Sequence, residues 1–184
     1  MAYRSGTYVA FYAEGKTEPD ETDMKYYNLL QAWDKNKAFD FSFVNSHEKA
    51  SAVRDTSKKI TLENTLKERL RNSKNMILVI GKTTRLDRDW VPMEIEYAVE
   101  NCKITIIAAY PGYLNIRAPQ QLSLLWPTAL KERIENNTAH VIHIPFREKP
   151  IIDAISQFDY NKFPNGGGLG HYNDDAYRSW GLLT

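Results

Sequence analysis

The stretch of the sequence best suited to chemistry is DWVPMEI, residues 89–95, in which Glu94 is the candidate catalytic group. The apolar face of a predicted helix is marked here by Val91, Ile95, Ala98 and Cys102. Glu94 stands about 100° from Ile95 around the helix axis, at the edge of that face. Because Glu94 is near the positive end of the helix dipole, its ionised form is favoured. Most acidic residues in first turns are only solvated, so spacing alone leaves a structural and a catalytic role open.

The segments that must position Glu94 alternate between strand-like and helix-like patterns. Apolar runs typical of strands occupy residues 8–12, 39–44, 76–80, 104–109 and 141–144. Helical patterns occupy residues 19–36, 61–70, 89–101 and 151–158, and helix-like pieces lie within 119–137. Thr61 is expected to begin the second helix, since residues 50–59 are polar and irregular. Pro92 fits only a first turn, which places the start of its helix just before it.

This alternation predicts an α/β domain with a parallel sheet. Five strands in the order 2-1-3-4-5, with helices on both faces, make a flavodoxin-like fold. Such sheets bind ligands beyond the carboxyl ends of the strands, where the strand order reverses, here between the first and third strands. The residues expected to line this cleft with Glu94 are Phe11, Tyr12, Asn45, His47, Gly81, Thr83 and Trp90.

Length and composition indicate one globular domain. The chain has 184 residues, enough for one sizeable core and short for two. We expect the domain to span residues 1–160. A glycine-rich and aromatic tail, residues 161–184, departs from the rest of the sequence. This tail is either a loose end or a segment that docks its aromatic side chains on the body or on another chain.

Charge and cysteine content exclude several classes of protein. The formal net charge of +1 argues against binding nucleic acid through a basic surface. The single cysteine, Cys102, excludes an internal disulfide and offers no metal-cluster pattern, so no metal site is expected. The sequence has no apolar run of about 18 residues and no secretion signal at its start. We therefore expect a cytoplasmic protein without a membrane span.

Three local patterns resemble known binding motifs but do not meet the requirements of those motifs. The triplet Gly81-Lys82-Thr83 resembles the end of a phosphate-binding P-loop, but Met76 stands where that motif requires its first glycine. The GGGLG run of the tail does not lie between a strand and a helix, so it is not a dinucleotide fingerprint. His140 and His143 are three residues apart on a strand, on opposite faces, and are poor partners for one metal ion.

The surroundings of Glu94 resemble a known family. GKTT at residues 81–84, a short polar linker, WVPMEI at 90–95 and the apolar strand at 103–109 are similar to TIR domains, above all to the TIR-like proteins of the bacterial Thoeris antiphage system. That family has a Gly-Ser-x-Thr-like strand end, a Trp-Val-x-x-Glu-Ile helix start, and an apolar strand soon after a Gly-Lys or Asn-Lys pair. The triplet at 101–103, Asn-Cys-Lys, stands at this last place. The resemblance covers about residues 7–145.

The resemblance implies an enzyme that cleaves the nicotinamide–ribose bond of NAD, with Glu94 as its catalytic residue. Loss of neutral nicotinamide leaves an oxocarbenium-like ribose, which a nearby carboxylate stabilises. Attack by a hydroxyl of the same substrate instead of water gives a cyclic ADP-ribose. By resemblance to Thoeris, such a product is a second messenger that activates a partner effector. NAD is then the substrate, and no cofactor is expected.

The resemblance also suggests roles for the other cleft residues. Phe11 or Tyr12 would stack on nicotinamide or adenine, and Thr83 would hydrogen-bond a ribose or phosphate. Trp90 either walls the pocket or packs its helix onto the sheet. The chain departs from the family at residues 45–47, where an acidic residue is frequent. It also departs at residues 12–14, Tyr-Ala-Glu, where the family often has serine followed by an aromatic or basic residue.

Two other functions stay open at this level. One is a non-catalytic TIR-like scaffold or adaptor that acts by self-association or partner binding, and the other is a nucleotide receptor of flavodoxin-like shape without turnover. The sequence does not determine which ADP-ribose isomer or conjugate is made, what triggers activity, whether the chain forms a homo-oligomer, or what the tail does.

Overall fold

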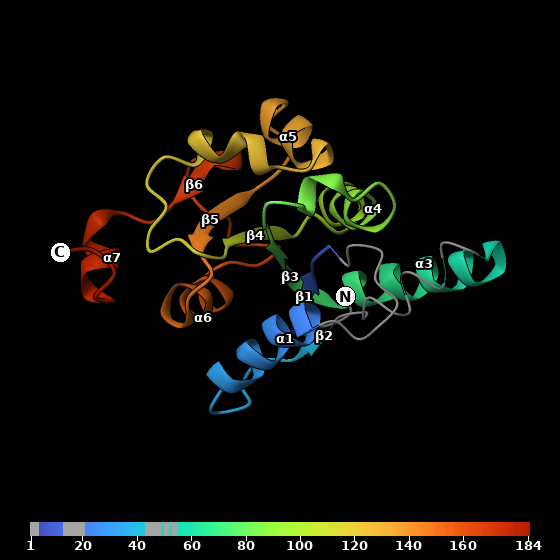
Figure 1. The fold of residues 1–184 in the computed structure, drawn as a ribbon, viewed down its shortest axis with the longest axis horizontal. Helices are drawn as coiled ribbons and strands as arrows, with labels where there is room; N and C mark the ends of the chain where they lie inside the picture. The colour runs from blue at the N-terminus through green and yellow to red at the C-terminus, as the bar shows by residue number, and fades with distance from the viewer. Residues whose placement is uncertain (1–3, 13–20, 43–48, 50–51, 53–54) are drawn as a thin grey trace.

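Six parallel strands form the central sheet of the protein in a computed structural model, in the order β2-β1-β3-β4-β5-β6 (Figure 1). The strands are β1 (Gly6–Ala10), β2 (Phe41–Ser42), β3 (Ser73–Val79), β4 (Thr105–Tyr110), β5 (Val141–Pro145) and β6 (Gly170–His171). The structure describes residues 4–12, 21–42, 49, 52 and 55–184, without the side chains of 21–24. The predicted flavodoxin-like order is confirmed, and β6 extends it by one strand.

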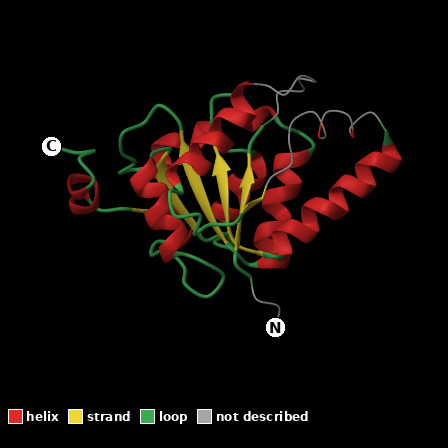
Figure 2. Ribbon diagram, turned by 90° about the horizontal axis from the view of Figure 1, so that it is seen from below, coloured by secondary structure: helices red, strands yellow, loops and turns green. Residues whose placement is uncertain are grey.

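The helices connect these strands and cover both faces of the sheet (Figure 2). They are α1 (Glu21–Trp33), α3 (Thr56–Arg71), α4 (Trp90–Glu96), α5 (Thr128–Glu135), α6 (Glu148–Gln157) and α7 (Asp174–Ser179). A π-helical turn, η2 (Tyr97–Cys102), continues α4, and 3-10 turns lie at η1 (Thr84–Leu86), η3 (Pro119–Leu125) and η4 (Gly167–Leu169). The helix expected at residues 89–101 is therefore present as α4 followed by η2.

Alternating side chains of the central strands enter two separate cores. Met76 and Leu78 of β3 pack on the face covered by α3, α4 and α5. Ile77 and Val79 of the same strand pack on the other face, against α1 and α6. Because every position of β3 from Asn75 on is buried, the strand reads as a continuous apolar run, which is how the sequence showed it.

Helix α3 begins earlier than the sequence suggested. Asp55 caps its amino terminus, and the Asp55 carboxylate accepts hydrogen bonds from the backbone N–H groups of Ser57 (3.0 Å) and Lys58 (3.3 Å). The prediction that Thr61 begins this helix is wrong, because an aspartate cap satisfies the first free N–H groups of a polar, weakly amphipathic turn.

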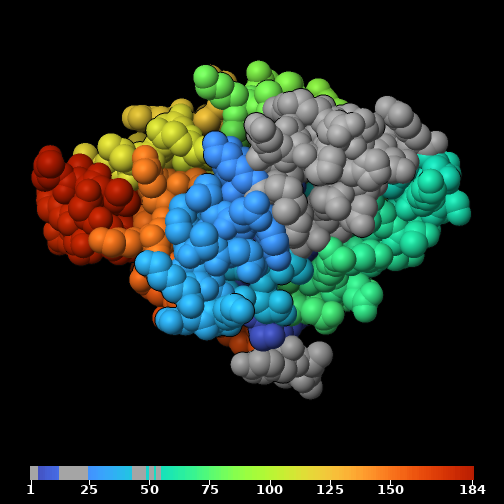
Figure 3. All heavy atoms as spheres, turned by 60° about the horizontal axis from the view of Figure 1, so that its bottom comes forward, coloured from blue at the N-terminus to red at the C-terminus, as the bar shows by residue number. Residues whose placement is uncertain are grey.

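The C-terminal tail is docked on the body of the same chain. It adds β6 to the edge of the sheet beside β5. The Tyr177 ring in α7 is fully buried, and its hydroxyl donates to the Ile116 carbonyl (3.1 Å). The Tyr172 hydroxyl donates to the Asp153 carboxylate on α6 (2.6 Å). Figure 3 shows this segment (red) as one end of the molecule, away from α3. Of the two alternatives for the tail, docking on the body is the one observed.

A buried hydrogen-bond chain ties the tail to the sheet. His143 of β5 lies 2.9 Å (Nε2) from the Gly168 carbonyl and 2.8 Å (Nδ1) from the Tyr110 hydroxyl. A carbonyl only accepts, so Nε2 carries the hydrogen and Nδ1 accepts from Tyr110. The Tyr110 oxygen in turn accepts from Trp126 Nε1 at 2.8 Å. Every member is satisfied only while His143 is neutral, and burial lowers the pKa of His143 to about 4.

His143 should make stability fall in mild acid. Its ordinary pKa of about 6.5 in the unfolded chain exceeds its folded pKa, so below pH 6.5 the unfolded state binds a proton that the folded state does not. Between pH 7 and pH 5 this costs about 2 kcal/mol of unfolding free energy. Urea unfolding at several pH values measures it. His143→Gln should flatten the curve between pH 6.5 and 4, whereas His171→Gln, at an exposed position, should not. Equal pH dependence in wild type and His143→Gln would contradict the assignment.

The β5–β6 pairing should depend on Gly170. A Cβ added there would lie 2.6 Å from the Val141 carbonyl oxygen and 2.9 Å from the Asn165 carbonyl oxygen, both on the backbone. Gly170→Ala should therefore separate β6 from β5 and lower the unfolding free energy by about 2 kcal/mol or more. Gly81→Ala is the matched control, since the nearest atom to its Cβ is 3.9 Å away. Equal melting temperatures for the two variants would show that β6 is not needed for stability.

Candidate functional site

A buried aspartate sets the start of the helix that carries Glu94. One oxygen of Asp87 accepts from the backbone N–H groups of Asp89 (2.8 Å) and Trp90 (3.0 Å), and the other accepts from that of Val91 (3.3 Å). These bonds satisfy the free donors of the first turn of α4. The helix therefore begins just before Pro92, as predicted, and presents Glu94 in its second turn toward β1.

Glu94 is fully buried and holds two partners with one oxygen. Its Oε1 atom accepts a hydrogen bond from the Tyr8 hydroxyl (2.5 Å) and one from the Lys49 ammonium group (2.8 Å). Its Oε2 atom is buried and makes no hydrogen bond with the described part of the chain. The sequence placed Glu94 at the edge of the apolar face. Tyr8 and Lys49 cover that edge, so the carboxylate lies inside the fold.

Lys49 is held in place from three directions. Its side chain is buried, and its ammonium nitrogen forms the ion pair with Glu94. The same nitrogen lies 5.7 Å from the centre of the Phe11 ring, a distance suited to a cation–π contact. Its backbone carbonyl accepts from Trp90 Nε1 at 3.1 Å. Trp90 is itself buried in the core, so it packs α4 on the sheet and also fastens the Lys49 backbone to that helix.

The charges of this cluster compensate one another. A carboxylate without a cation would be very costly at a fully buried position, and the Lys49 ammonium group supplies the cation. Burial, and then the negative charge of Glu94, raise the pKa of Tyr8 well above its usual range. Tyr8 therefore keeps its proton at physiological pH and acts as a hydrogen-bond donor to the carboxylate.

The other predicted cleft residues follow β1 and β3 at the same edge of the sheet. Phe11 is buried against Lys49, and Tyr12 is partly exposed. The Gly81 N–H group donates to the Thr84 hydroxyl (2.9 Å), which closes the end of β3 and leaves Thr83 partly exposed beside it. Contacts of these residues with a substrate stay predictions.

Two predicted residues, Asn45 and His47, lie outside the described residues. For the remaining candidates the structure gives one clear grouping. It joins Phe11 and Trp90 to Glu94 through Lys49.

The sequence analysis missed three residues of this cluster. Asp87, three positions before the first apolar helical residues, carries the signature of a helix cap and was detectable. Tyr8 also gave a signal, because a tyrosine hydroxyl inside a buried strand needs a hydrogen-bond partner. Lys49 gave none, since it lies just before the polar, irregular stretch 50–59 and is far from Glu94 in the chain.

Two further features were sought among the described residues. None of their His, Cys, Asp and Glu side chains gather in a group of three or more that would hold a metal ion. None of their helices combines the length and the apolar character needed to cross a bilayer.

The chain matches the model of a known family. The model of the family described as "Thoeris protein ThsB, TIR-like domain" matches residues 8–116, more than half of the 184 residues. The matched part contains residues 8–10 of β1, the whole of β2, β3 and β4, and all members of the Glu94 cluster.

Removing the cation of the buried pair should be much worse than removing both charges. Lys49→Met leaves the Glu94 carboxylate buried without its counter-ion, and we expect a loss of about 3–5 kcal/mol in unfolding free energy. In Lys49→Met combined with Glu94→Gln no lone charge remains, so most of this loss should be recovered. Urea unfolding of wild type, both single variants and the double variant measures the coupling. Additive losses would contradict a direct buried ion pair.

Proposed function

This chain belongs to the TIR-like domain family of the Thoeris protein ThsB, among antiphage-defence proteins of the TIR type, and from that premise we propose that it cleaves the nicotinamide–ribose bond of NAD. The observation that carries the proposal is the state of the Glu94 carboxylate. One oxygen is fixed by Tyr8 and Lys49, and the other is buried and has no partner in the described structure. Such an oxygen suits a cationic or hydroxyl-bearing ligand.

Cleavage of the nicotinamide–ribose bond needs a carboxylate near the ribose and no general acid. When the C1′–N1 bond breaks, its electron pair goes to the pyridinium nitrogen, so nicotinamide leaves as a neutral molecule without a general acid. The positive charge moves to the ribose, where the carboxylate of Glu94 stabilises it in a water-poor site. Attack by water at C1′ releases one proton and gives ADP-ribose. Attack by a hydroxyl of the same molecule also releases one proton and gives a cyclic ADP-ribose, which has one water molecule less than ADP-ribose.

In this proposal the ion pair between Lys49 and Glu94 keeps the site inactive until the two groups separate. The ammonium group and the ribose cation compete for the same carboxylate, and like charges repel at short distance. Glu94 is also fully buried, so a substrate has to displace the groups that cover it, among them Lys49. A site of this kind has low activity until a trigger or assembly step separates Lys49 from Glu94.

The product would act through a partner. Membership of the Thoeris family implies an effector protein that works with this chain. In our proposal the (cyclic) ADP-ribose product is the diffusible signal that activates this effector, and NAD is consumed as substrate. The alternative is a TIR-like scaffold that works by self-association or partner binding, in which the Glu94 cluster only stabilises the fold.

Incubation with NAD tests the proposal. The purified protein is mixed with NAD, with and without lysate from phage-infected cells, and nicotinamide and ADP-ribose products are resolved by mass. We expect release of nicotinamide in at least the triggered sample. Glu94→Gln should lower the rate by about 100-fold or more, since it removes the charge on which the transition state depends. Thermal melting of the variant checks that it is folded.

Glu96→Gln is the matched control, because Glu96 lies on the same helix with an exposed side chain. It should leave the rate unchanged. An active, folded Glu94→Gln variant would exclude Glu94 as the catalytic residue. No turnover in either sample, together with self-association in light scattering that survives Glu94→Gln, would favour the scaffold.

A further inference from the structure

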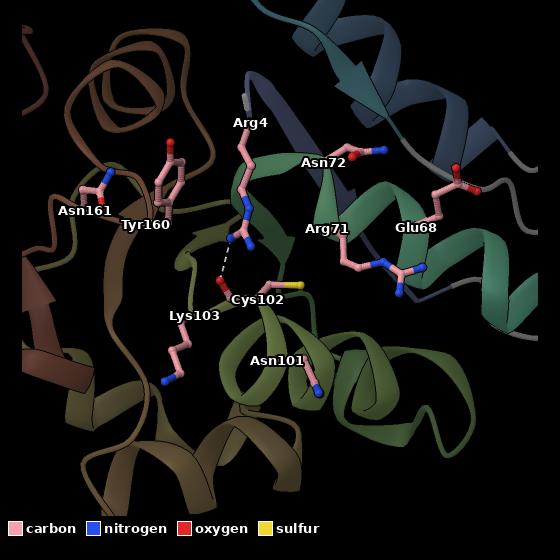
Figure 4. Close-up of a pocket in the computed structure, with 9 residues that line it drawn as sticks. All are labelled: Arg4, Glu68, Arg71, Asn72, Asn101, Cys102, Lys103, Tyr160 and Asn161. Atoms are coloured by element: carbon pink, nitrogen blue, oxygen red, sulfur yellow. Dashed lines mark hydrogen bonds between the residues drawn. The ribbon is translucent and has the colours of Figure 1, made fainter. Parts of the chain in front are cut away.

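A pocket lies at the opposite edge of the sheet from Glu94. Figure 4 shows the residues that line it. It is formed where the chain enters β1, β3 and β4, so it lies at the amino ends of these parallel strands. Its volume is about 710 Å³, within the range of pockets that bind small molecules. Cys102, at its floor, follows Glu94 by eight residues along α4 and η2, which corresponds to about 12 Å of helix.

The lining of this amino-edge pocket is strongly cationic. It contains Arg4, Arg71 and Lys103 but only one acidic side chain, that of Glu68. The positive charges of the lining act on Cys102 at the floor of the pocket. Burial raises the pKa of Cys102, while the positive charges of Arg4 and Arg71 act in the opposite direction. Both guanidinium groups are therefore close enough to favour negative charge in the pocket.

Arg4 is fixed in an orientation that leaves donors free. It donates from one terminal nitrogen to the Cys102 carbonyl (2.7 Å), and its guanidinium carbon lies 5.1 Å from the centre of the Tyr160 ring. The carbonyl bond uses one of the five N–H groups of arginine, and stacking uses none. Figure 4 shows Arg4 between Tyr160 and Cys102, with Arg71 across the opening. Because the Arg4 side chain is already ordered, binding a ligand costs it little further conformational entropy.

Lys103 occupies a position where glycine is the usual residue. It ends the π-helical turn with φ 53° and ψ 41°, in the left-handed region that side chains with a Cβ disfavour. Its backbone N–H donates to the Ala98 carbonyl, so the turn needs no side chain at this position. The lysine side chain is exposed and lines the pocket. Strained residues of this kind are often kept for what their side chains contact.

From these observations we infer that the amino-edge pocket binds a phosphorylated small molecule of about nucleotide size. Three cations match a ligand with two or more negative charges, and arginine suits the fork geometry of phosphate oxygens. A single phosphate group would fill little of the volume, whereas a nucleotide fits it. Three asparagine side chains in the lining offer further donors and acceptors (Figure 4). The inference does not depend on the cleavage of NAD.

Calorimetric titration of the full chain tests this inference, with ADP and inorganic pyrophosphate as probes and adenosine as the uncharged control. ADP and pyrophosphate should bind, and adenosine should bind at least about tenfold more weakly. In Lys103→Gly combined with Arg71→Gln, the affinity for ADP should fall by at least about tenfold. Lys103→Gly relieves the left-handed strain, so its melting temperature should equal or exceed that of wild type. Arg71 is exposed, so the double variant should also melt close to wild type, and with an unchanged melting temperature weaker binding cannot be ascribed to a damaged fold.

The matched control removes two exposed lysine charges elsewhere, in Lys58→Gln combined with Lys131→Gln. Its affinity for ADP should equal that of wild type. Three results would overturn the inference: no binding of ADP or pyrophosphate at about 1 mM, ADP binding unaffected by the pocket variants, or equal losses in the pocket and control variants. The second result would mean that ADP binds elsewhere, for example near Glu94.

Discussion

The backbone hydrogen bonds of a parallel sheet hold this molecule together, and they require both faces of the sheet to be covered. The central strands therefore bury almost every side chain, and the helices have to return along the sheet after each strand. This requirement puts all carboxyl ends of the strands at one edge and all amino ends at the other. It also brings the start of α4 to the first edge and the end of η2 to the second. Both sites discussed above are consequences of that arrangement.

At the carboxyl edge the dominant feature is a charged group in a place without water. A buried carboxylate is stable only with a counter-charge, and Lys49 provides it. The same pair determines how the site behaves. In the reaction proposed above, low-polarity surroundings would strengthen the effect of the Glu94 charge on a cationic ribose, whereas in the structure the Lys49 ammonium group neutralises that charge. The ion pair that stabilises the fold is therefore the one that the proposed reaction would have to break.

At the amino edge the chain is cationic and open, and the C-terminal tail reinforces the sheet beside it. The tail adds β6, buries Tyr177 and closes the hydrogen-bond chain of His143. The segment after α6 carries Tyr160 to the amino-edge pocket, and the Asp159 carbonyl accepts from the Thr105 hydroxyl of β4 at 2.9 Å. These contacts join the tail and the segment after α6 to β4 and β5.

The sequence by itself predicted the α/β class, the parallel order of the first five strands and the position of α4, and it singled out Glu94 as the candidate catalytic residue. The positions of strands and helices are local features, because apolar periodicity and Pro92 act within one element, whereas the strand order followed from the few arrangements open to alternating strands and helices. Only the tertiary structure decided that Glu94 is buried, that Lys49 and Tyr8 are its partners, and that the tail belongs to the sheet. Glu94 is separated in sequence from Lys49 by 45 positions and from Tyr8 by 86. The periodicity of a single segment cannot predict contacts between residues so far apart. They arise because a carboxylate placed in a two-sided core must find its hydrogen bonds and its counter-charge wherever the folded chain supplies them.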